Sequence, residues 1–228
     1  MDGARAVPPP AHIVLRESTR AAHEAAEASP VMQRLLAGEL DEGGYRSLLE
    51  AQWGLLEGWE SERWDWLTEI GPTHHWRYLS RATALKRDLT PERDSAPERD
   101  LAPERDRAPV GARPARDSLS RKAAGPVAHG LKTCRAQGAL LQAWGELYVI
   151  EGSALGGRII VKHLRERFPA LPHHFYAIGE NADEPWPRFQ SVLDRVLAEP
   201  AALQAAIDGA LRMFARFQQT LQDDAAHV

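Results

Sequence analysis

Three glycines lie inside the strongest helical pattern of the chain. Apolar residues recur at helical spacing between about 137 and 168, and Gly152, Gly156 and Gly157 fall in the middle of that stretch. A glycine in a helix interior costs about 1 kcal/mol relative to alanine. Gly152 and Gly156 are four residues apart and share one helix face, where a flat object can approach the backbone. That object is either a neighbouring helix or a ligand, and the stretch alone does not decide between them.

The rest of the chain also follows helical spacing, and no strand pattern is found. Asp41 is expected to cap a long helix, and Gly71 with Pro72 to stop it. A short apolar segment lies at 31–36, and the last helix is expected to begin at Pro200. Other helices are predicted at about 12–28, 42–69, 74–88 and 185–198. We therefore predict a single all-α domain, a bundle of about six to eight helices.

Two segments are not expected to join the folded core. Residues 1–11 form a Pro-rich arm, and residues 89–118 contain a repeated Pro-Glu-Arg-Asp unit. The repeat is charged and nearly devoid of large apolar residues, so it cannot bury enough surface to become ordered. We predict a flexible arm at 1–11 and a domain at 12–228 with a disordered insertion at 89–118.

Composition excludes several classes of protein. The net charge is −4 and no face is obviously basic, so nucleic acid is not an expected partner. Cys134 is the single cysteine, which rules out an intramolecular disulfide and fits a reducing compartment. The chain lacks both a signal-peptide pattern and the run of roughly 18 apolar residues that a membrane span needs. We expect a cytoplasmic protein.

His23 is the first residue that could carry chemistry. It lies on the apolar stripe of the helix predicted at 12–28. A histidine in such a place is often a satisfied core residue, but a neutral imidazole can also be the axial ligand of a haem iron. Arg16 precedes it by seven residues, on nearly the same face and roughly 10 Å away. It is either a solvated surface charge or a cation that reaches an acidic group at the edge of a macrocycle.

Other groups of metal-binding residues are less convincing. The pairs His74-His75 and His173-His174 look like ligands, but adjacent residues on a helix point about 100° apart. None of the nine histidines has a glutamate three residues before it, which argues against a di-iron carboxylate site. Cys134 has no neighbour in sequence that would activate it as a nucleophile.

Two stretches far apart in the chain resemble one family. Leu15-Arg-Glu-Ser-Thr-Arg-Ala-Ala-His23 resembles the proximal helix of haem oxygenases. Leu147-Tyr-Val-Ile-Glu-Gly-Ser-Ala-Leu-Gly-Gly157 resembles their distal helix, in the form typical of the bacterial branch and especially of the enzymes associated with bacteriophytochromes. Residues 175–189, with Trp186, also look like that branch. The resemblance extends over most of the chain outside the arm, the insertion and the extreme C-terminus.

The resemblance implies roles for individual residues. His23 is expected to bind the haem iron, and Arg16 to contact a haem propionate. Three glycines, Gly152, Gly156 and Gly157, are expected to lie over the other face of haem.

The remaining assignments are less complete. Gly152, Ser153 and Gly156 form the expected catalytic set. Ser153 stands where mammalian-type enzymes carry an aspartate that organises distal water, so the resemblance leaves the route of proton delivery unassigned. Arg188 and Arg195 are candidates for holding the second propionate.

The activity implied by the resemblance is oxidative cleavage of haem to biliverdin, with release of iron and carbon monoxide. Haem is both cofactor and substrate, and O2 is consumed. No flavin or nicotinamide motif is found, so a ferredoxin or a flavoprotein reductase is the expected electron donor, and a bacteriophytochrome pathway the expected use of the product. One alternative is a non-enzymatic haem-binding or haem-transfer protein on the same fold. Another is an all-α enzyme without haem, such as a thiaminase-like protein that uses Cys134.

Overall fold

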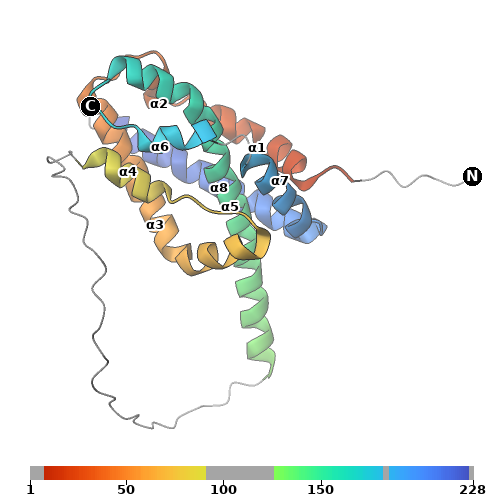
Figure 1. Cartoon of the computed structure of the whole chain (residues 1–228). Coiled ribbons are helices and arrows are strands. Elements are labelled where there is room, and N and C mark those ends of the chain that lie inside the picture. Colours follow the sequence, from red (N-terminus) through yellow and green to blue (C-terminus); the bar gives the residue numbers. More distant parts are fainter. Residues whose placement is uncertain (1–7, 91–125, 182–184, 226–228) are drawn as a thin grey trace, which may run out of the picture.

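The computed structural model describes residues 8–90, 126–181 and 185–225, and every regular element in these ranges is helical (Figure 1). The all-α prediction is therefore confirmed. None of the described helices is long and apolar enough to cross a membrane. The elements are α1 (Ala11–Glu27), α2 (Pro30–Leu36), α3 (Glu42–His74), α4 (Arg81–Leu89), α5 (Pro126–Arg167), α6 (His174–Ala177), the 3-10 helix η1 (Ile178–Asn181), α7 (Pro185–Val196) and α8 (Pro200–Ala225).

The predicted arm and insertion lie mostly outside the described residues. Residues 1–7 and 91–118 are not described, whereas Ala11 is already the first residue of α1. Residues 89 and 90 belong to the end of α4 and its cap. The long helix that contains the glycine stretch begins at Pro126, earlier than the apolar pattern indicated.

Two predicted boundaries near Pro72 are wrong. Helix α3 does not stop at Gly71-Pro72 but continues to His74 and ends at His75, whose φ of 53° is left-handed. Pro72 removes one backbone hydrogen bond in the last turn. It is the left-handed His75 that turns the chain, so that the N–H groups of His75 and Trp76 donate to the carbonyls of Pro72 and Gly71. Residues 75–80, predicted as helix, are therefore a connection before α4.

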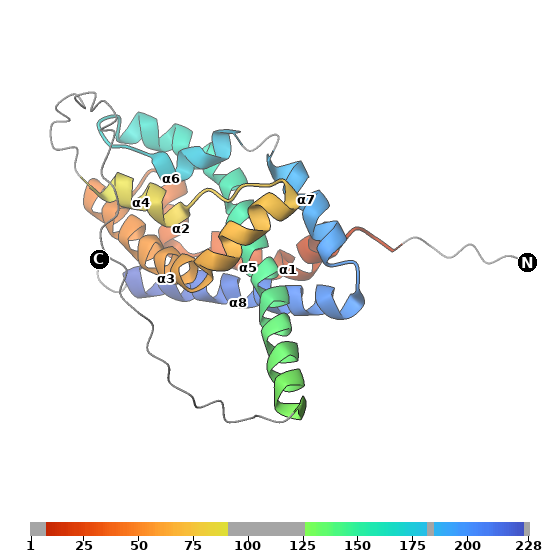
Figure 2. The same ribbon diagram turned by 60° about the horizontal axis from the view of Figure 1, so that its bottom comes forward.

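Helix α8 is the base on which the other helices pack. It packs most extensively against α5 and also contacts α1, α2 and α3 (Figures 1 and 2). The backbones of α5 and α8 meet at two glycines. A Cβ atom on Gly145 would collide with the carbonyl of Ala206, and one on Gly209 with the carbonyl of Gln142. Close helix–helix contact thus occurs at Gly145, about two turns before the glycine stretch.

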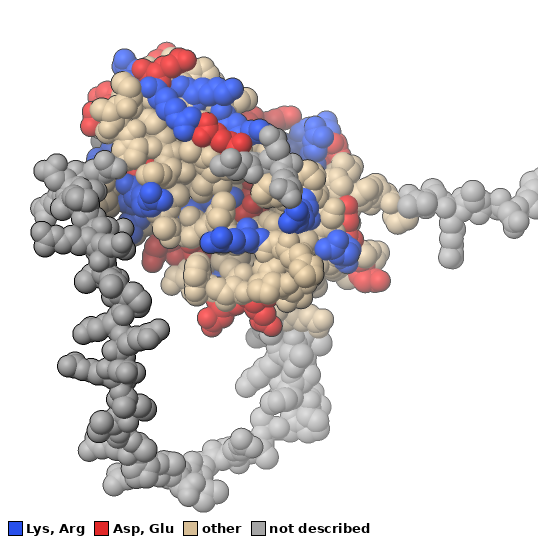
Figure 3. Space-filling model, viewed as in Figure 1, with Lys and Arg blue, Asp and Glu red and all other residues tan. Residues whose placement is uncertain are grey.

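The charged side chains do not form a field of one sign on the face shown in Figure 3, where basic and acidic groups are interspersed. This agrees with the small net charge of −4. The face is not of the kind that binds nucleic acid through a continuous basic surface.

A buried carboxylate fastens α4 to α3. Glu60, only 5% exposed, accepts hydrogen bonds from the backbone N–H groups of Arg81 at 2.7 Å and Ala82 at 3.0 Å. The hydroxyls of Tyr78 and Ser80 donate to the same carboxylate at 2.9 and 2.6 Å. A negative charge at a helix N-terminus satisfies N–H groups that have no partner within the helix. Glu60 therefore determines where α4 begins.

Replacing Glu60 by alanine should lower the free energy of unfolding by at least about 3 kcal/mol, because each buried donor left unpaired costs on the order of 1–3 kcal/mol. Glu57, exposed on the same helix, is the control, and Glu57→Ala should change stability by no more than about 0.5 kcal/mol. Urea unfolding followed by circular dichroism measures both variants. Equal stability of the two would contradict the role of Glu60.

Candidate functional site

The first half of α1 meets α5 near Tyr148. Burial raises the pKa of Tyr148, and both the charge of Arg16 and the hydroxyl of Thr19 oppose that shift, which places these two α1 residues beside the phenol. Trp186 of α7 lies on the same side, with its ring centroid 6.0 Å from that of Tyr148. The Trp186 ring also comes within 3.5 Å of the position that a Cβ on Gly152 would occupy. These residues close one end of the region between α1 and α5.

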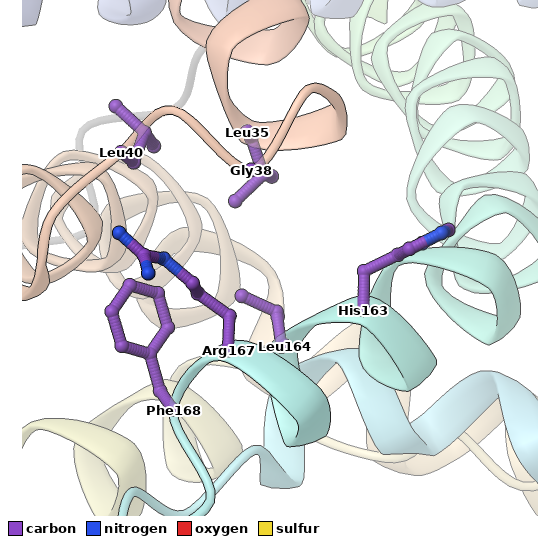
Figure 4. A pocket seen from close by; sticks show the side chains of 7 residues that line it. All are labelled: Leu35, Gly38, Leu40, His163, Leu164, Arg167 and Phe168. Atoms are coloured by element: carbon purple, nitrogen blue, oxygen red, sulfur yellow. The ribbon is translucent and has the colours of Figure 1, made fainter.

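The segment after α1 meets α5 again near its C-terminal end. There the end of α2 and the turn after it face the last turns of α5 across a small hollow (Figure 4). Since α1 leads directly into α2, the two meeting points show that α1 and α5 run in the same direction. Between these points both helices pack on α8 but hardly on each other. The hollow is lined by Leu35, Gly38, Leu40, His163, Leu164, Arg167 and Phe168.

His23 lies on α1 between the two meeting points, and 57% of its side chain is exposed. The ring rests edge-on against Phe214 of α8 at 5.8 Å, and its Nδ1 is 3.7 Å from Oε2 of Glu27. Among the described residues, Nε2 has no hydrogen-bond partner. His23 is therefore no satisfied core histidine. One ring nitrogen is oriented by its surroundings and the other is available to a ligand, as in an axial metal ligand.

On α5, the stretch that contains Ser153, Gly156 and Ile159 has a face that no other part of the described structure covers. A Cβ on Gly156 would meet no atom within 4 Å, and Ile159, one turn later, is 61% exposed. Ser153 is also exposed, and its hydroxyl donates to the carbonyl of Ile150 at 2.8 Å. An exposed isoleucine beside bare backbone is a surface on which an apolar plate could rest.

Gly157 faces a different neighbour. It is buried, and a Cβ there would lie 2.9 Å from the carbonyl oxygen of Tyr176 in α6. A Cβ on Gly179 would likewise collide with the carbonyl of Ala154. Gly157 therefore packs closely against α6. The glycine stretch combines both explanations that its sequence left open, with helix packing at Gly157 and an open face at Gly156.

A buried ion pair fixes α5 beside the glycine stretch. Arg81 of α4 donates to Oε1 of Glu151 at 3.0 Å, and the two side chains are only 2% and 12% exposed. Burial raises the pKa of the Glu151 carboxyl, and Arg81 opposes that shift. Because Glu151 directly precedes Gly152, this pair restrains the rotation of α5 about its axis.

The structure indicates the surroundings of Arg195, one of the two basic residues predicted on α7. Burial lowers the pKa of His74, and the charge of Arg195 lowers it further, which places Arg195 toward the end of α3. Arg188, seven residues earlier, shares that side of α7. Asp194 of α7 contacts α1 at His12. Its carboxylate accepts a hydrogen bond from the backbone N–H of His12 at 3.0 Å and lies 2.9 Å from Nδ1 of the His12 ring. Nothing in the sequence pattern indicated this pair.

The other candidate metal groups find no support in the described part of the chain. No cluster of three or more His, Cys, Asp or Glu side chains that could hold an ion occurs there. His173 is buried and pairs instead with the Tyr45 hydroxyl, 3.1 Å from its Nδ1. The side chain of Cys134 lies outside the description.

Comparison with known proteins identifies the family. The family model described as "Heme oxygenase" matches residues 11–223, so the chain belongs to the heme oxygenase family. The heme oxygenase of Xanthomonas campestris pv. campestris (strain 8004) is 33% identical over 197 residues, which cover 86% of this chain and 99% of the relative. The predicted haem-degrading enzyme, with haem as its ligand, is confirmed at the level of the family.

Solved structures agree on the fold. The heme oxygenase from Leptospira interrogans matches with a TM-score of 0.63 and 20% identity, over 94% of this chain and all of that one. Heme oxygenase-1 from the cyanobacterium Synechocystis sp. PCC6803, solved in complex with heme, matches with a TM-score of 0.62 and 16% identity, over 96% of this chain and 94% of that one. At this identity the likeness concerns the fold alone.

Mutations at Gly157 and Gly156 can test separately the packing face and the open face of the glycine stretch. Gly157→Leu should lower the free energy of unfolding by at least about 1–3 kcal/mol, because the new side chain collides with the backbone of Tyr176. Gly156→Leu should fold as well as the wild type, since it removes a helix-interior glycine and enters open space. It should nevertheless weaken hemin binding by more than about tenfold, or about 1.4 kcal/mol. Denaturant unfolding and Soret titration measure the two effects. Wild-type hemin affinity in Gly156→Leu would exclude this face of α5 as the haem wall.

Proposed function

We propose that this protein binds haem between α1 and α5 and cleaves it oxidatively to biliverdin, with release of iron and carbon monoxide. One observation supports this location of the haem site. His23, exposed and with Nε2 unpaired, lies between the two points where α1 and its continuation meet α5, along the stretch where α5 leaves Gly156 uncovered. A flat molecule with a metal at its centre fits such a pair of faces.

The residues present suit a haem. Its iron needs one protein ligand, which Nε2 of His23 can supply from α1. The opposite wall has to lack bulky side chains near the iron, and Gly156 meets that requirement, whereas the Trp186 ring lies against Gly152. The apolar edge of the ring would cover Ile159, which is otherwise 61% exposed. When bound, the haem iron supplies the binding and activation of O2.

On the proximal side, three residues orient the substrate. The Glu27 carboxylate lies 3.7 Å from Nδ1 of His23, where it would accept the Nδ1–H after a small movement once Nε2 binds the iron. Arg16, beside Tyr148, offers a positive charge to a haem propionate at the end where Trp186 closes the region. A held propionate fixes the rotation of the ring, and with it the meso carbon that is presented for cleavage.

On the distal side, the chain controls water and protons. The bare backbone at Gly156 would keep the helix close to the ring and leave little room for bulk water. The Ser153 hydroxyl uses its hydrogen on the Ile150 carbonyl, so its lone pairs can accept a hydrogen bond from an ordered water. Ser153 would thereby position the water that delivers protons to the reacting oxygen.

The electron donor, the cellular location and the use of the product are inferred from the sequence resemblance. We infer a ferredoxin or a flavoprotein reductase as the electron donor, a cytoplasmic location, and a bacteriophytochrome pathway as consumer of biliverdin. The alternative of a haem-binding or haem-transfer protein keeps the same site without turnover. The cysteine enzyme is disfavoured by the family to which the chain belongs.

Turnover separates the enzyme from the carrier. Hemin-loaded protein supplied with ascorbate or a ferredoxin reductase system, in the presence of catalase, should give the absorption spectrum of biliverdin and release carbon monoxide. Catalase removes peroxide, so ring opening by free peroxide does not contribute. A haem spectrum that persists without ring opening would contradict the enzymatic function and favour the carrier.

A further inference from the structure

Aromatic side chains form a continuous series from the proposed haem site into the core. Each ring lies at a distance typical of favourable aromatic pairs from the next. The series begins at the closed end of the site and crosses α7 to the connection before α4 and then to α3. Its ring-centroid distances are 6.0 Å for Tyr148–Trp186, 6.0 Å for Trp186–Phe189, 5.0 Å for Phe189–Trp76, 6.2 Å for Trp76–Tyr78 and 6.2 Å for Tyr78–Trp59.

The inner end of this series is paired with carboxylates. The hydroxyl of Tyr78 donates to Oε1 of Glu60 at 2.9 Å, and the indole N–H of Trp59 donates to Oε2 of Glu146 at 2.9 Å. Tyrosine and tryptophan are among the side chains most readily oxidised by one electron, and the O–H or N–H of each becomes far more acidic when it is. Here each ring has a base already placed at the proton that it would lose.

Nearby cations make proton loss necessary. The guanidinium of Arg81 lies 5.6 Å from the Tyr78 ring, and that of Arg63 lies 5.4 Å from the Trp59 ring. A positive charge above a ring opposes formation of a second positive charge on it. Electron loss at these rings is therefore favourable only when the proton leaves as well, so that a neutral radical remains.

We propose that this series, which we call the aromatic relay, delivers single electrons from Tyr78 and Trp59 to the haem site when hydrogen peroxide oxidises the bound haem. The inference rests on the proposed haem site. It assigns to the protein a second, protective activity: reduction of peroxide by electrons that the protein's own side chains supply.

The electrons and protons balance. One hydrogen peroxide takes up two electrons and two protons to become two waters. One electron leaves Tyr78 as its phenol proton passes to Glu60, and one leaves Trp59 as its indole proton passes to Glu146. The two protons consumed at the haem site come from solvent. A one-electron reductant such as ascorbate then returns an electron to each ring, and each carboxylate returns its proton.

Packing alone explains buried aromatic rings and their hydrogen bonds, so the test requires a signal that packing does not produce. Ferric hemin complexes are mixed with hydrogen peroxide without reductant, frozen within the reaction time and examined by electron paramagnetic resonance. The wild type should show a tyrosine-type radical that Tyr78→Phe abolishes. Trp76→Leu, which removes one ring from the aromatic relay, should lower its yield several-fold. Trp53, which has no ring contact among the described residues, gives the control Trp53→Phe, whose signal should equal that of the wild type.

A second readout follows the substrate. With ascorbate present and O2 removed, so that O2-dependent ring cleavage does not contribute, peroxide should bleach hemin several-fold faster in Tyr78→Phe than in the wild type or Trp53→Phe, because one electron source is missing. Tyr78→Phe keeps the shape of the ring, so it tests the aromatic relay even if Trp76→Leu does not fold. An unchanged radical and unchanged bleaching in Tyr78→Phe overturn the aromatic relay. Absence of a Soret band on addition of hemin would instead overturn the proposed haem site.

Discussion

The contact between α5 and α8 is the constraint on which the rest of the structure depends. Gly145 and Gly209 let the two backbones touch, which fixes α5 on α8. The same α8 carries Phe214, against which the ring of His23 rests. Both walls of the proposed site are thus held by one helix, and their separation does not depend on contacts between α1 and α5. A slot whose walls are held from outside can stay open without a ligand.

Further restraints set the orientation of each wall. Glu60 fixes the start of α4, Arg81 of α4 pairs with Glu151, and the pair holds α5 beside Gly152. On the other wall, Asp194 binds the first turn of α1 through its backbone and the His12 ring. A buried ion pair contributes little net stability but strongly penalises arrangements that break it. These contacts are therefore better understood as fixing the geometry of the site than as holding the fold together.

Helical periodicity was sufficient to predict the all-α fold and to place His23 and the three glycines on helices. It could not show what each face meets. Gly157 is adjacent to Gly156 in sequence, yet a rotation of 100° about the helix directs it to the backbone of α6. Likewise, Arg195 lies on the predicted helix but acts on His74.

Helical periodicity also could not predict which residues far apart in the sequence contact each other. Asp194 and His12 are 182 residues apart, and only the packing of α7 on α1 brings them together. The end of α3 was misplaced because Pro72 was expected to act as a stop, whereas the left-handed His75 performs that role. Tyr148 was not among the predicted site residues, although it lies four residues before Gly152 and therefore on the same face of the helix.

The central claim is that His23 holds the haem iron, and its most direct test is the ligation of hemin in wild type and His23→Ala. The wild-type ferrous complex should show an iron–histidine vibration by resonance Raman spectroscopy. His23→Ala should lose this vibration, and added imidazole should restore it by entering the vacated position. An iron–histidine vibration that persists in His23→Ala without imidazole would contradict the account.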